Sequence, residues 1–348
     1  MKDKILINGG LGYIGSHTVV EMMEADYEVV IIDSLSNSSI EVVDLIGSIV
    51  GHKPSFAQLD LCDEKALNSF FQSGSGRDVT AIIHFAAHKN VGESVTNPLK
   101  YYNNNLGSLI NTLTAMQDFN IPALVYSSSC SVYGNPKVIP VTEETPLQRA
   151  ESPYGNTKKM GEEIIEDTVR TSQVKAISLR YFNPIGAHPS NAIGEFPSEF
   201  ADNVMPALMA TVRGHKEQFS VYGNGYNTAD GTCIRDYIDV VDLAKAHVRA
   251  VDRICSGNNE SSYEVFNLGT GKGASVMEMI QMVEKVTGKK LKYEIEPARK
   301  GDVEAVYANP ALANDKLNWK AERSLEDMIT TSWAWSNVLQ EMNIDNGG

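Results

Sequence analysis

The segment KILINGGLGYIGS (residues 4–16) decides the fold of this chain of 348 residues. A short apolar run, a cluster of glycines and the start of a helical stretch follow one another, which is the order of a buried strand, a tight turn and a helix. Gly10, Gly12 and Gly15 have GxGxxG spacing, while Gly9, Gly12 and Gly15 have GxxGxxG spacing. Such glycines let the backbone approach a pyrophosphate closely at the start of the helix. The segment therefore predicts a dinucleotide-binding βαβ unit; a tight turn without a ligand is the alternative.

Outward from this segment, apolar runs and helical stretches alternate through the first half of the chain. Alternation of this kind predicts a doubly wound α/β fold, a parallel sheet with helices on both faces. After about residue 182, segments rich in Gly, Pro and Asn predict loops that carry binding residues. We expect a dinucleotide-binding domain over 1–182 and a smaller, interleaved α/β substrate lobe over 183–348. The expected strands are 4–8, 27–33, 56–60, 79–85, 123–129 and 174–181, with helices such as 16–25, 100–118 and 154–170.

Composition excludes several classes of protein. The net charge of −14 argues against a nucleic acid partner. No apolar run reaches the roughly 18 residues that would span a membrane. The N-terminus turns into a strand too early for a signal peptide, so we expect a cytoplasmic protein. The four cysteines have no CxxC spacing, which argues against a structural zinc and a disulfide framework.

Asp33 indicates which dinucleotide the glycine turn accepts. It ends the second predicted strand, 18 residues after Gly15. A carboxylate at this place accepts hydrogen bonds from ribose hydroxyls and repels a 2′-phosphate. We therefore expect NAD as the cofactor in preference to NADP.

The sequence PYGNTKK (153–159) places Tyr154 four residues before Lys158. On a helix the two side chains share a face, and an ammonium beside a phenol lowers the pKa of the phenol. Such a tyrosine can take a proton from a hydroxyl group while hydride leaves the same carbon. The spacing also occurs in YGNPK, from Tyr133 to Lys137, where Pro136 disfavours a helix. The second copy shows that spacing alone proves little, and that the helical context of Tyr154 is what makes it a candidate.

Two further groups of polar residues stand at predicted strand ends. The cluster SSSCS (127–131) ends the fifth strand, where ligands lie in a doubly wound sheet, and a serine there could bind the reacting hydroxyl. His84 and His88 are four residues apart, but at a strand end and in the following loop rather than on a helix. For these histidines we expect packing or hydrogen bonding, and no metal site.

The motifs together resemble the UDP-glucose 4-epimerase family of the extended short-chain dehydrogenase/reductase superfamily. The resemblance runs from about residue 4 to 335 and rests on several motifs in the correct order. They are GGLGYIGS, HFAAHKNVGES, YSSSCSVYG, SPYGNTK, RYFNPIGAHPS and TCIRDYIDV.

The resemblance implies a Rossmann sheet and a role for each matching residue. Tyr154 is implied as the acid/base, Lys158 as the residue that holds the nicotinamide ribose and tunes Tyr154, and Ser129 as the partner of the sugar 4-hydroxyl. Implied cofactor contacts, besides Tyr154 and Lys158, are Gly9, Gly12, Tyr13, Ile14, Gly15, Asp33, Asn37, Ser38, Asp60, Leu61, Phe85, Ala86, Ala87, Lys89, Asn104, Ser127 and Tyr181. Implied contacts of a UDP-sugar, besides Ser129 and Tyr154, are Asn183, Asn203, Ser220, Tyr222, Arg235, Arg299, Asp302 and Val306.

The reaction implied by the resemblance is 4-epimerisation of a UDP-hexose through a transient 4-keto sugar, with NAD kept bound. Related 4,6-dehydratases use an Asp–Glu pair where this chain has Cys130 and Ser131, neither a good acid or base at neutral pH. A glucuronate epimerase or decarboxylase stays open, because carboxylate recognition is hard to read from sequence. A non-catalytic NAD-binding sensor or scaffold is the alternative of another class, although such proteins commonly lack the Tyr–Lys pair or the serine.

Two finer expectations follow from the resemblance. In the family, the position seven residues after the last phosphate-binding arginine lies against C2 of the sugar, and a tyrosine there is associated with rejecting N-acetyl sugars. Val306 takes that position here, with Tyr307 next to it, so we expect UDP-GlcNAc and UDP-GalNAc to be accepted as well as UDP-glucose and UDP-galactose. The family also forms homodimers through two helices per subunit, which here are about 100–118 and 154–170.

Overall fold

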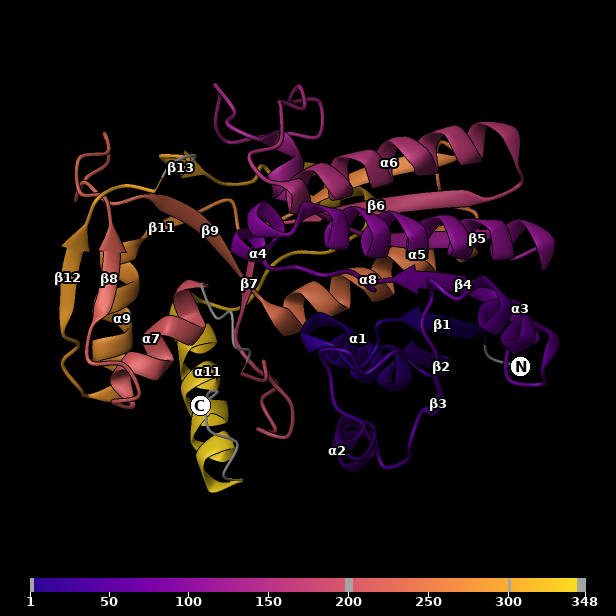
Figure 1. Ribbon diagram of the computed structural model, residues 1–348, viewed down its shortest axis with the longest axis horizontal. Coiled ribbons are helices and arrows are strands. Elements are labelled where there is room, and N and C mark those ends of the chain that lie inside the picture. Colours follow the sequence, from indigo (N-terminus) through magenta and orange to yellow (C-terminus); the bar gives the residue numbers. More distant parts are fainter. Residues whose placement is uncertain (1–2, 198–202, 300–301, 343–348) are drawn as a thin grey trace.

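A computed structural model describes residues 3–197, 203–299 and 302–342, and a parallel seven-stranded sheet forms its centre (Figure 1). The strand order is β10-β6-β5-β4-β1-β2-β3. The predicted fold class is confirmed, and the six expected strands agree with the observed bounds to within two residues at each end. The strands are β1 (Lys4–Asn8), β2 (Glu28–Asp33), β3 (Ser55–Gln58), β4 (Val79–His84), β5 (Ala123–Ser129), β6 (Lys175–Tyr181) and β10 (Tyr263–Leu268).

The direction of strand succession reverses between β1 and β4. The chain first adds β2 and β3 on one side of β1, and then adds β4, β5 and β6 on the other. The loops that leave the carboxyl ends of β1 and β4 therefore diverge, which opens the crevice where doubly wound sheets bind their ligands.

Helices cover both faces of the sheet because side chains alternate along each strand. On β1, Ile5 and Ile7 pack into the core beneath one layer of helices, while Leu6 packs into the core on the opposite face. The first layer comprises α1 (Tyr13–Glu24), α2 (Glu41–Val50) and α8 (Val240–Cys255), and the second comprises α3 (Glu64–Gln72), α5 (Pro98–Asp118) and α6 (Pro153–Thr171). Two short helical segments, α4 (Val91–Thr96) and η1 (Cys130–Tyr133), follow β4 and β5.

The second half of the chain is divided between two units. Helix α8 packs on α1, β10 joins the main sheet beside β6, and α10 (Ala311–Lys316) packs on β10. The remaining elements form a second lobe, seen at the left of Figure 1 around a core of its own, and this is the lobe expected to bind the substrate. Its strands are β7 (Asn183–Ile185), β8 (Phe219–Tyr222), β9 (Ile234–Asp239), β11 (Gly273–Ser275), β12 (Tyr293–Glu296) and β13 (Ala305–Val306), and its helices are α7 (Val204–Val212), α9 (Val276–Thr287) and α11 (Leu325–Glu341).

Within the ranges that the structure describes, no helix is both long enough and apolar enough to cross a membrane.

Candidate active site

The glycine turn between β1 and α1 has the shape of a cradle for a phosphate group. Gly9 has a positive φ of 76°, and its N–H donates to the carbonyl of Ile32 at 2.7 Å. A Cβ on Gly15 would lie 2.3 Å from the Gly9 oxygen, whereas one on Gly12 would lie at 3.4 Å from that oxygen, with nothing closer. No side chain caps the start of α1, so its first amides are available to an anion. The turn therefore fits the pyrophosphate of a dinucleotide.

Replacing Gly15 by Ala is expected to close this cradle. The added methyl group cannot coexist with the Gly9 oxygen, so the turn must move, at a cost of about 1–3 kcal/mol in folding free energy. We expect a lower melting temperature and purified protein with less bound dinucleotide, measured by the absorbance of the supernatant after acid denaturation. Gly74→Ala is the control, because nothing lies within 4 Å of a Cβ at exposed Gly74. Equal behaviour of the two variants would contradict the prediction.

Asp33 lies at the carboxyl end of β2, as the sequence predicts, and it also organises the loops around it. Its carboxylate accepts hydrogen bonds from the amides of Leu11 at 3.1 Å and Leu35 at 3.0 Å. It accepts a third from the hydroxyl of Ser38 at 2.8 Å. Asp33 thus joins the glycine turn to the loop after β2, which contains Asn37 as well.

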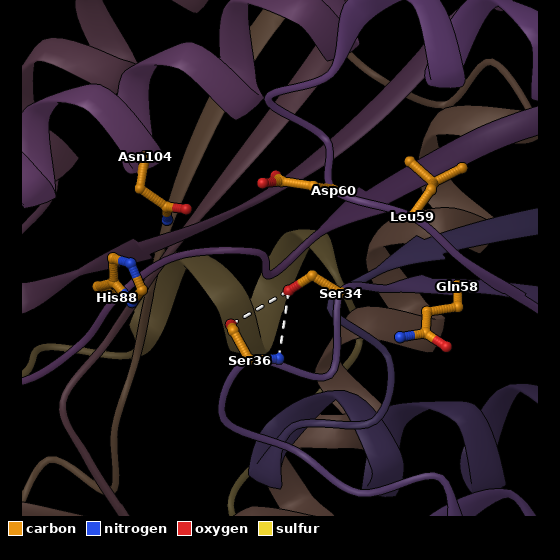
Figure 2. A pocket seen from close by; sticks show the side chains of 7 residues that line it. All are labelled: Ser34, Ser36, Gln58, Leu59, Asp60, His88 and Asn104. Carbon is orange, nitrogen blue, oxygen red and sulfur yellow. Dashed lines mark hydrogen bonds between the residues drawn. The ribbon is translucent and has the colours of Figure 1, made fainter.

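A pocket of about 520 Å³ opens beside this loop, at the carboxyl ends of β2 and β3 (Figure 2). Asp60 and Asn104 line it, and both were expected at the cofactor. Sequence reasoning missed five other lining residues, most of which could have been found because they end or follow strands β2 and β3. The five are Ser34, Ser36, Gln58, Leu59 and His88. Leu61, also expected at the cofactor, is 4% exposed and packs in the core next to Asp60.

The loop after β4 touches the glycine turn. Its amides at Phe85 and Ala86 both donate to the carbonyl of Asn8, at 2.8 and 3.1 Å. A Cβ on Gly9 would lie 2.8 Å from the Ala86 nitrogen, so the two loops fit together only with glycine there. Beyond Ala87, the ammonium of Lys89 lies 5.5 Å from the ring centre of Tyr13 and pairs with Glu195 at 2.7 Å. Lys89 is thus held above the start of α1, which begins with Tyr13 and Ile14.

Helix α6 brings the expected Tyr–Lys pair to the end of β5. Ser152 caps the helix by accepting from the amide of Gly155, and Pro153 occupies its first turn. The ammonium of Lys158 donates to the carbonyl of Ser127 at 2.6 Å and lies 6.0 Å from the ring centre of Tyr154. Tyr154 in turn lies close enough to Ser129 for the serine hydroxyl to stabilise its phenolate form. All three residues expected to be catalytic are therefore together.

In the other copy of the motif, YGNPK, the tyrosine and the lysine do not share a helix face, as its proline predicts. Segment η1 ends at Tyr133, and Gly134 has a φ of 60°. Tyr133 is fully buried, and its hydroxyl donates to Asn267, whereas Lys137 is exposed. His84 is also structural, since it is buried and contacts the side chains of Asn8 and Thr112.

Burial controls the protonation of the Tyr–Lys pair. It raises the pKa of Tyr154 to about 12, although the nearby hydroxyl of Ser129 acts in the opposite direction. It lowers the pKa of Lys158 to about 7, against the attraction of Glu162. In the protein alone, burial outweighs the neighbouring charge on this pKa, and the ammonium of Lys158 points at the carbonyl of Ser127. The expected lowering of the Tyr154 pKa by Lys158 and the nicotinamide charge stays a prediction for the loaded site.

The residues expected at a sugar nucleotide lie at the start of β7, at the start of α7, on β8, near the start of β9 and in the segment around β13. Tyr181 ends β6 and is buried, with its hydroxyl 3.1 Å from the ring nitrogen Nε2 of His247. The side-chain oxygen of Asn183 is buried and has no hydrogen-bond partner among the described residues, a feature of a group that meets a ligand. Asn203, the N-cap of α7, is exposed. Ser220 is on β8, two residues before Tyr222, and the two therefore share a face of the strand.

Two arginines of the substrate lobe are held in different ways. The guanidinium of Arg299 stacks 3.7 Å from the ring centre of Tyr222. Arg235 donates to the carbonyls of Ile234 and Val303, and its Nη2 lies 3.7 Å from a carboxylate oxygen of Asp302. Two guanidinium groups suit a diphosphate, because each can offer a bidentate pair of donors.

Val306 and Tyr307 point to opposite sides of β13. Val306 is 7% exposed and packs with Val132, Phe182 and Cys130, next to Ser129. The ring of Tyr307 instead lies 3.5 Å from where a Cβ on Gly273 would be. Of the two, Val306 is therefore the side chain that packs in the cluster with Cys130, the residue after Ser129.

In the part of the chain that the structure describes, no three His, Cys, Asp or Glu residues gather in a way that could hold a metal ion.

Comparison with known proteins places this geometry in context. The family model described as GDP-mannose 4,6 dehydratase matches residues 6–332. The UDP-glucose 4-epimerase of Bacillus subtilis (strain 168) is 46% identical over 337 residues, which are 96% of this chain and 97% of the relative. A crystal structure of the UDP-glucose 4-epimerase of Stenotrophomonas maltophila with bound NAD and formylated UDP-arabinopyranose is 40% identical, with a TM-score of 0.93 over 98% of this chain and 99% of that one. For the Bifidobacterium longum enzyme in complex with NAD⁺ and UDP, the identity is 39% and the TM-score 0.91, over 99% and 100% of the two chains.

Proposed function

Because the chain belongs to the UDP-glucose 4-epimerase family, within the extended short-chain dehydrogenases/reductases, we propose that it interconverts UDP-glucose and UDP-galactose with a tightly bound NAD. The observation that carries this function is the meeting of Ser129, Tyr154 and Lys158 at the edge of the sheet that also holds the glycine turn. The cofactor is NAD, and Asp33 at the end of β2 suits its free ribose hydroxyls.

In this mechanism Tyr154 takes the proton of the sugar 4-hydroxyl, and Ser129 orients that hydroxyl. Bound NAD supplies a hydride acceptor and a positive charge. At neutral pH the phenol of Tyr154 is protonated in the protein alone, since burial raises its pKa to about 12. A cation next to a phenol favours the phenolate. The proton transfer therefore depends on the charge of the loaded site together with the ammonium of Lys158. When the 4-keto sugar presents its other face, Tyr154 returns the proton to the 4-oxygen, and C4 would take back its hydride on that face, so the configuration at C4 is inverted.

Inversion requires a firm hold on the nucleotide and a loose hold on the sugar. We assign the firm hold to Arg235 and Arg299 at the diphosphate, to Tyr222 beside the uracil, and to Asp302 at the ribose. Arg235 is fixed by two backbone carbonyls and Arg299 by stacking on Tyr222, so neither needs to be ordered when the diphosphate binds.

The test is proton NMR of the purified protein with UDP-glucose and no added NAD. We expect the anomeric signal of UDP-galactose to appear, since NAD is regenerated in each cycle and stays bound. A 4-keto-6-deoxy product would indicate a dehydratase, and no product even after addition of NAD would favour a non-catalytic NAD-binding protein. Either of these results would overturn the proposed function.

Two other reactions of the superfamily have less support. A 4,6-dehydratase needs an additional acid and base after the catalytic serine, but burial raises the pKa of the Cys130 thiol to about 12 and Ser131 donates to Ser129. A glucuronate epimerase or decarboxylase needs a cation for the sugar carboxylate. Both arginines that we place at the substrate are assigned to the diphosphate.

We further propose that the protein is a homodimer through α5 and α6, which lie side by side in the outer layer (Figure 1). Leu99 is 74% exposed, Ile110 is 46% exposed, and Val95 on the neighbouring α4 is 61% exposed. Apolar side chains gathered in this way mark protein interfaces. The double variant Leu99→Glu/Ile110→Glu is expected to be a monomer of about 38.1 kDa by light scattering, while the unaltered protein has twice this mass.

Ile295→Glu is the control for this prediction, because Ile295 is 53% exposed on β12, outside the proposed interface. The control should remain a dimer. A monomeric unaltered protein, or a double variant that keeps its dimeric mass, would contradict the interface.

The cytoplasm is the compartment that we propose. All four cysteines are unpaired, namely Cys62, Cys130, Cys233 and Cys255. Unpaired cysteines are typical of proteins that stay in a reducing compartment.

A further inference from the structure

Glu162 and Arg180 form a buried ion pair that the mechanism above does not use. The side chain of Glu162 is 5% exposed and that of Arg180 is 6% exposed. Arg180 Nε donates to one carboxylate oxygen at 2.9 Å, and Nη2 donates to the other at 2.6 Å. Ser128 donates a third hydrogen bond to the carboxylate, at 2.5 Å. The orientation of Glu162 is therefore fixed from two strands, β5 and β6.

Glu162 continues the catalytic face of α6. Tyr154, Lys158 and Glu162 are spaced four residues apart, so they occupy successive turns on one side of the helix. Three consecutive serines of β5 meet these three residues. Tyr154 lies near the hydroxyl of Ser129, Lys158 donates to the carbonyl of Ser127, and Glu162 accepts from the hydroxyl of Ser128. Helix and strand are thus held in one register at the reacting groups.

Arg180 is anchored in its turn. Its Nη1 donates to the hydroxyl of Tyr133 at 2.9 Å, and that hydroxyl donates to Asn267 on β10 at 2.7 Å. The network therefore crosses β5, β6 and β10 behind the catalytic residues. Buried ion pairs of this kind seldom add stability over apolar residues of similar volume. We therefore look for the role of the Glu162–Arg180 pair in the position and the charge of the side chains around it.

The charged groups around Lys158 indicate which charge it needs. On α6 it faces Tyr154 and Glu162, on β5 its ammonium lies 5.1 Å from the ring of Tyr126, and on β4 it faces His84. Burial lowers the pKa of His84 to about 3 and raises the pKa of both tyrosines, so these three are neutral. Among the described groups that act on Lys158, Glu162 is the anion that favours its protonated form.

We propose that Glu162, held by Arg180, is a positioning residue that keeps Lys158 charged and in register with Tyr154 and Ser129. The inference rests on the epimerase function proposed above.

The test is the double variant Glu162→Gln/Arg180→Gln, which removes both charges and leaves neither one buried alone. We expect kcat for UDP-glucose to fall about 10- to 100-fold, while KM changes less than about threefold. The fall is smaller than the full effect of a general acid/base group, because Tyr154 itself is still present. Bound NAD is expected to stay near the unaltered level. Because Glu162 raises the pKa of Lys158, its loss lowers that pKa, and the alkaline limb of the kcat–pH profile should move to lower pH.

The matched control is Arg253→Gln/Glu264→Gln, which removes a second forked ion pair joining α8 to β10. Its two hydrogen bonds measure 2.7 and 2.8 Å, and each of its side chains is 9% exposed. We expect a similar loss of melting temperature, with kcat and its pH profile unchanged. Arg180→Lys keeps the positive charge but loses the paired hydrogen bonds to the Glu162 carboxylate. This variant should fold and show a smaller fall in kcat, with the alkaline limb of its kcat–pH profile unmoved.

Equal loss of kcat in the two double variants, or a change in melting temperature alone, would overturn the role of Glu162. If the Glu162/Arg180 double variant does not fold, an unchanged kcat in Arg180→Lys overturns the positioning. Failure of the unaltered protein to epimerise UDP-glucose would instead contradict the proposed function, so the two failures are distinguishable.

Discussion

Replacing Tyr154 by Phe is expected to lower kcat for UDP-glucose by about 10²–10⁴-fold, the usual contribution of general acid–base catalysis, and to leave NAD bound. The change removes one oxygen atom, the only group at that position that can exchange a proton with the 4-hydroxyl. The cradle at Gly12 and Gly15 and the pocket beside Asp60 are untouched, so cofactor retention should not change. Turnover by NMR and the NAD content of the same preparation are the two measurements.

Tyr263→Phe is the control for the loss of a tyrosine hydroxyl. The hydroxyl of Tyr263 donates to Ser178 at 2.9 Å within the main sheet, and Ser178 lies three residues before Tyr181, the position on β6 that pairs with Ser129. This variant should lose some stability and keep its activity. Retention of more than a tenth of the activity by Tyr154→Phe would rule out Tyr154 as the acid/base. If Tyr154→Phe loses its bound NAD as well as its activity, disruption of the cofactor site explains the loss of activity, and this result would also contradict the prediction.

The second large effect is expected at Val306, which we propose as the residue facing C2 of the sugar. Val306→Tyr should lower kcat/KM for UDP-GlcNAc by about 10- to 200-fold relative to UDP-glucose, the range in which pocket size discriminates between substrates. The reason is volume: Val306 packs against Val132 and Phe182 beside the catalytic serine segment, where a phenol ring would fill the room for an N-acetyl group. Parallel NMR assays with the two substrates give the ratio.

Val306→Ala serves as the second variant, since a buried tyrosine could also disturb the packing around Val132. The smaller residue should keep both activities. If the unaltered protein converts UDP-glucose but not UDP-GlcNAc, the assignment of Val306 is wrong and the mechanism stands. The ring of Tyr307 lies toward Gly273, on the other side of β13, which is the argument against a shift of one residue in this assignment.

The sequence predicted those parts of the molecule that depend on local patterns. The run KILIN followed by glycines led to β1 and the turn, and the proline in YGNPK separated the structural Tyr133 from the candidate Tyr154. The conformation of the glycine turn and that of the YGNPK segment each depend on a few neighbouring residues, because steric limits on the backbone act locally. The same is true of Tyr154 and Lys158, whose spacing sets their common face.

Features that depend on distant segments were missed. Strand β10 joins the sheet beside β6, yet nothing in YEVFNL distinguishes an inserted seventh strand from one in the substrate lobe. The ion pair between Glu162 and Arg180 forms because β5 pairs with β6, and that pairing cannot be read from either segment alone. The four-residue spacing of Tyr154, Lys158 and Glu162 was the available signal for Glu162. The rise in the pKa of Tyr154 in the protein alone was also missed, because it comes from burial, which the sequence does not give.

The late arrival of β10 has a consequence for synthesis of the chain on the ribosome. Strand β6 pairs with β5 on one side and with β10 on the other, and the segment that covers this second side ends at Leu268. Until that residue has left the exit tunnel, the nascent sheet presents an open edge at β6, a template for pairing with other chains. Translation must thus proceed through most of the substrate lobe before the nucleotide-binding sheet can close, and a premature stop between Tyr181 and Tyr263 would release an aggregation-prone fragment rather than a smaller folded domain.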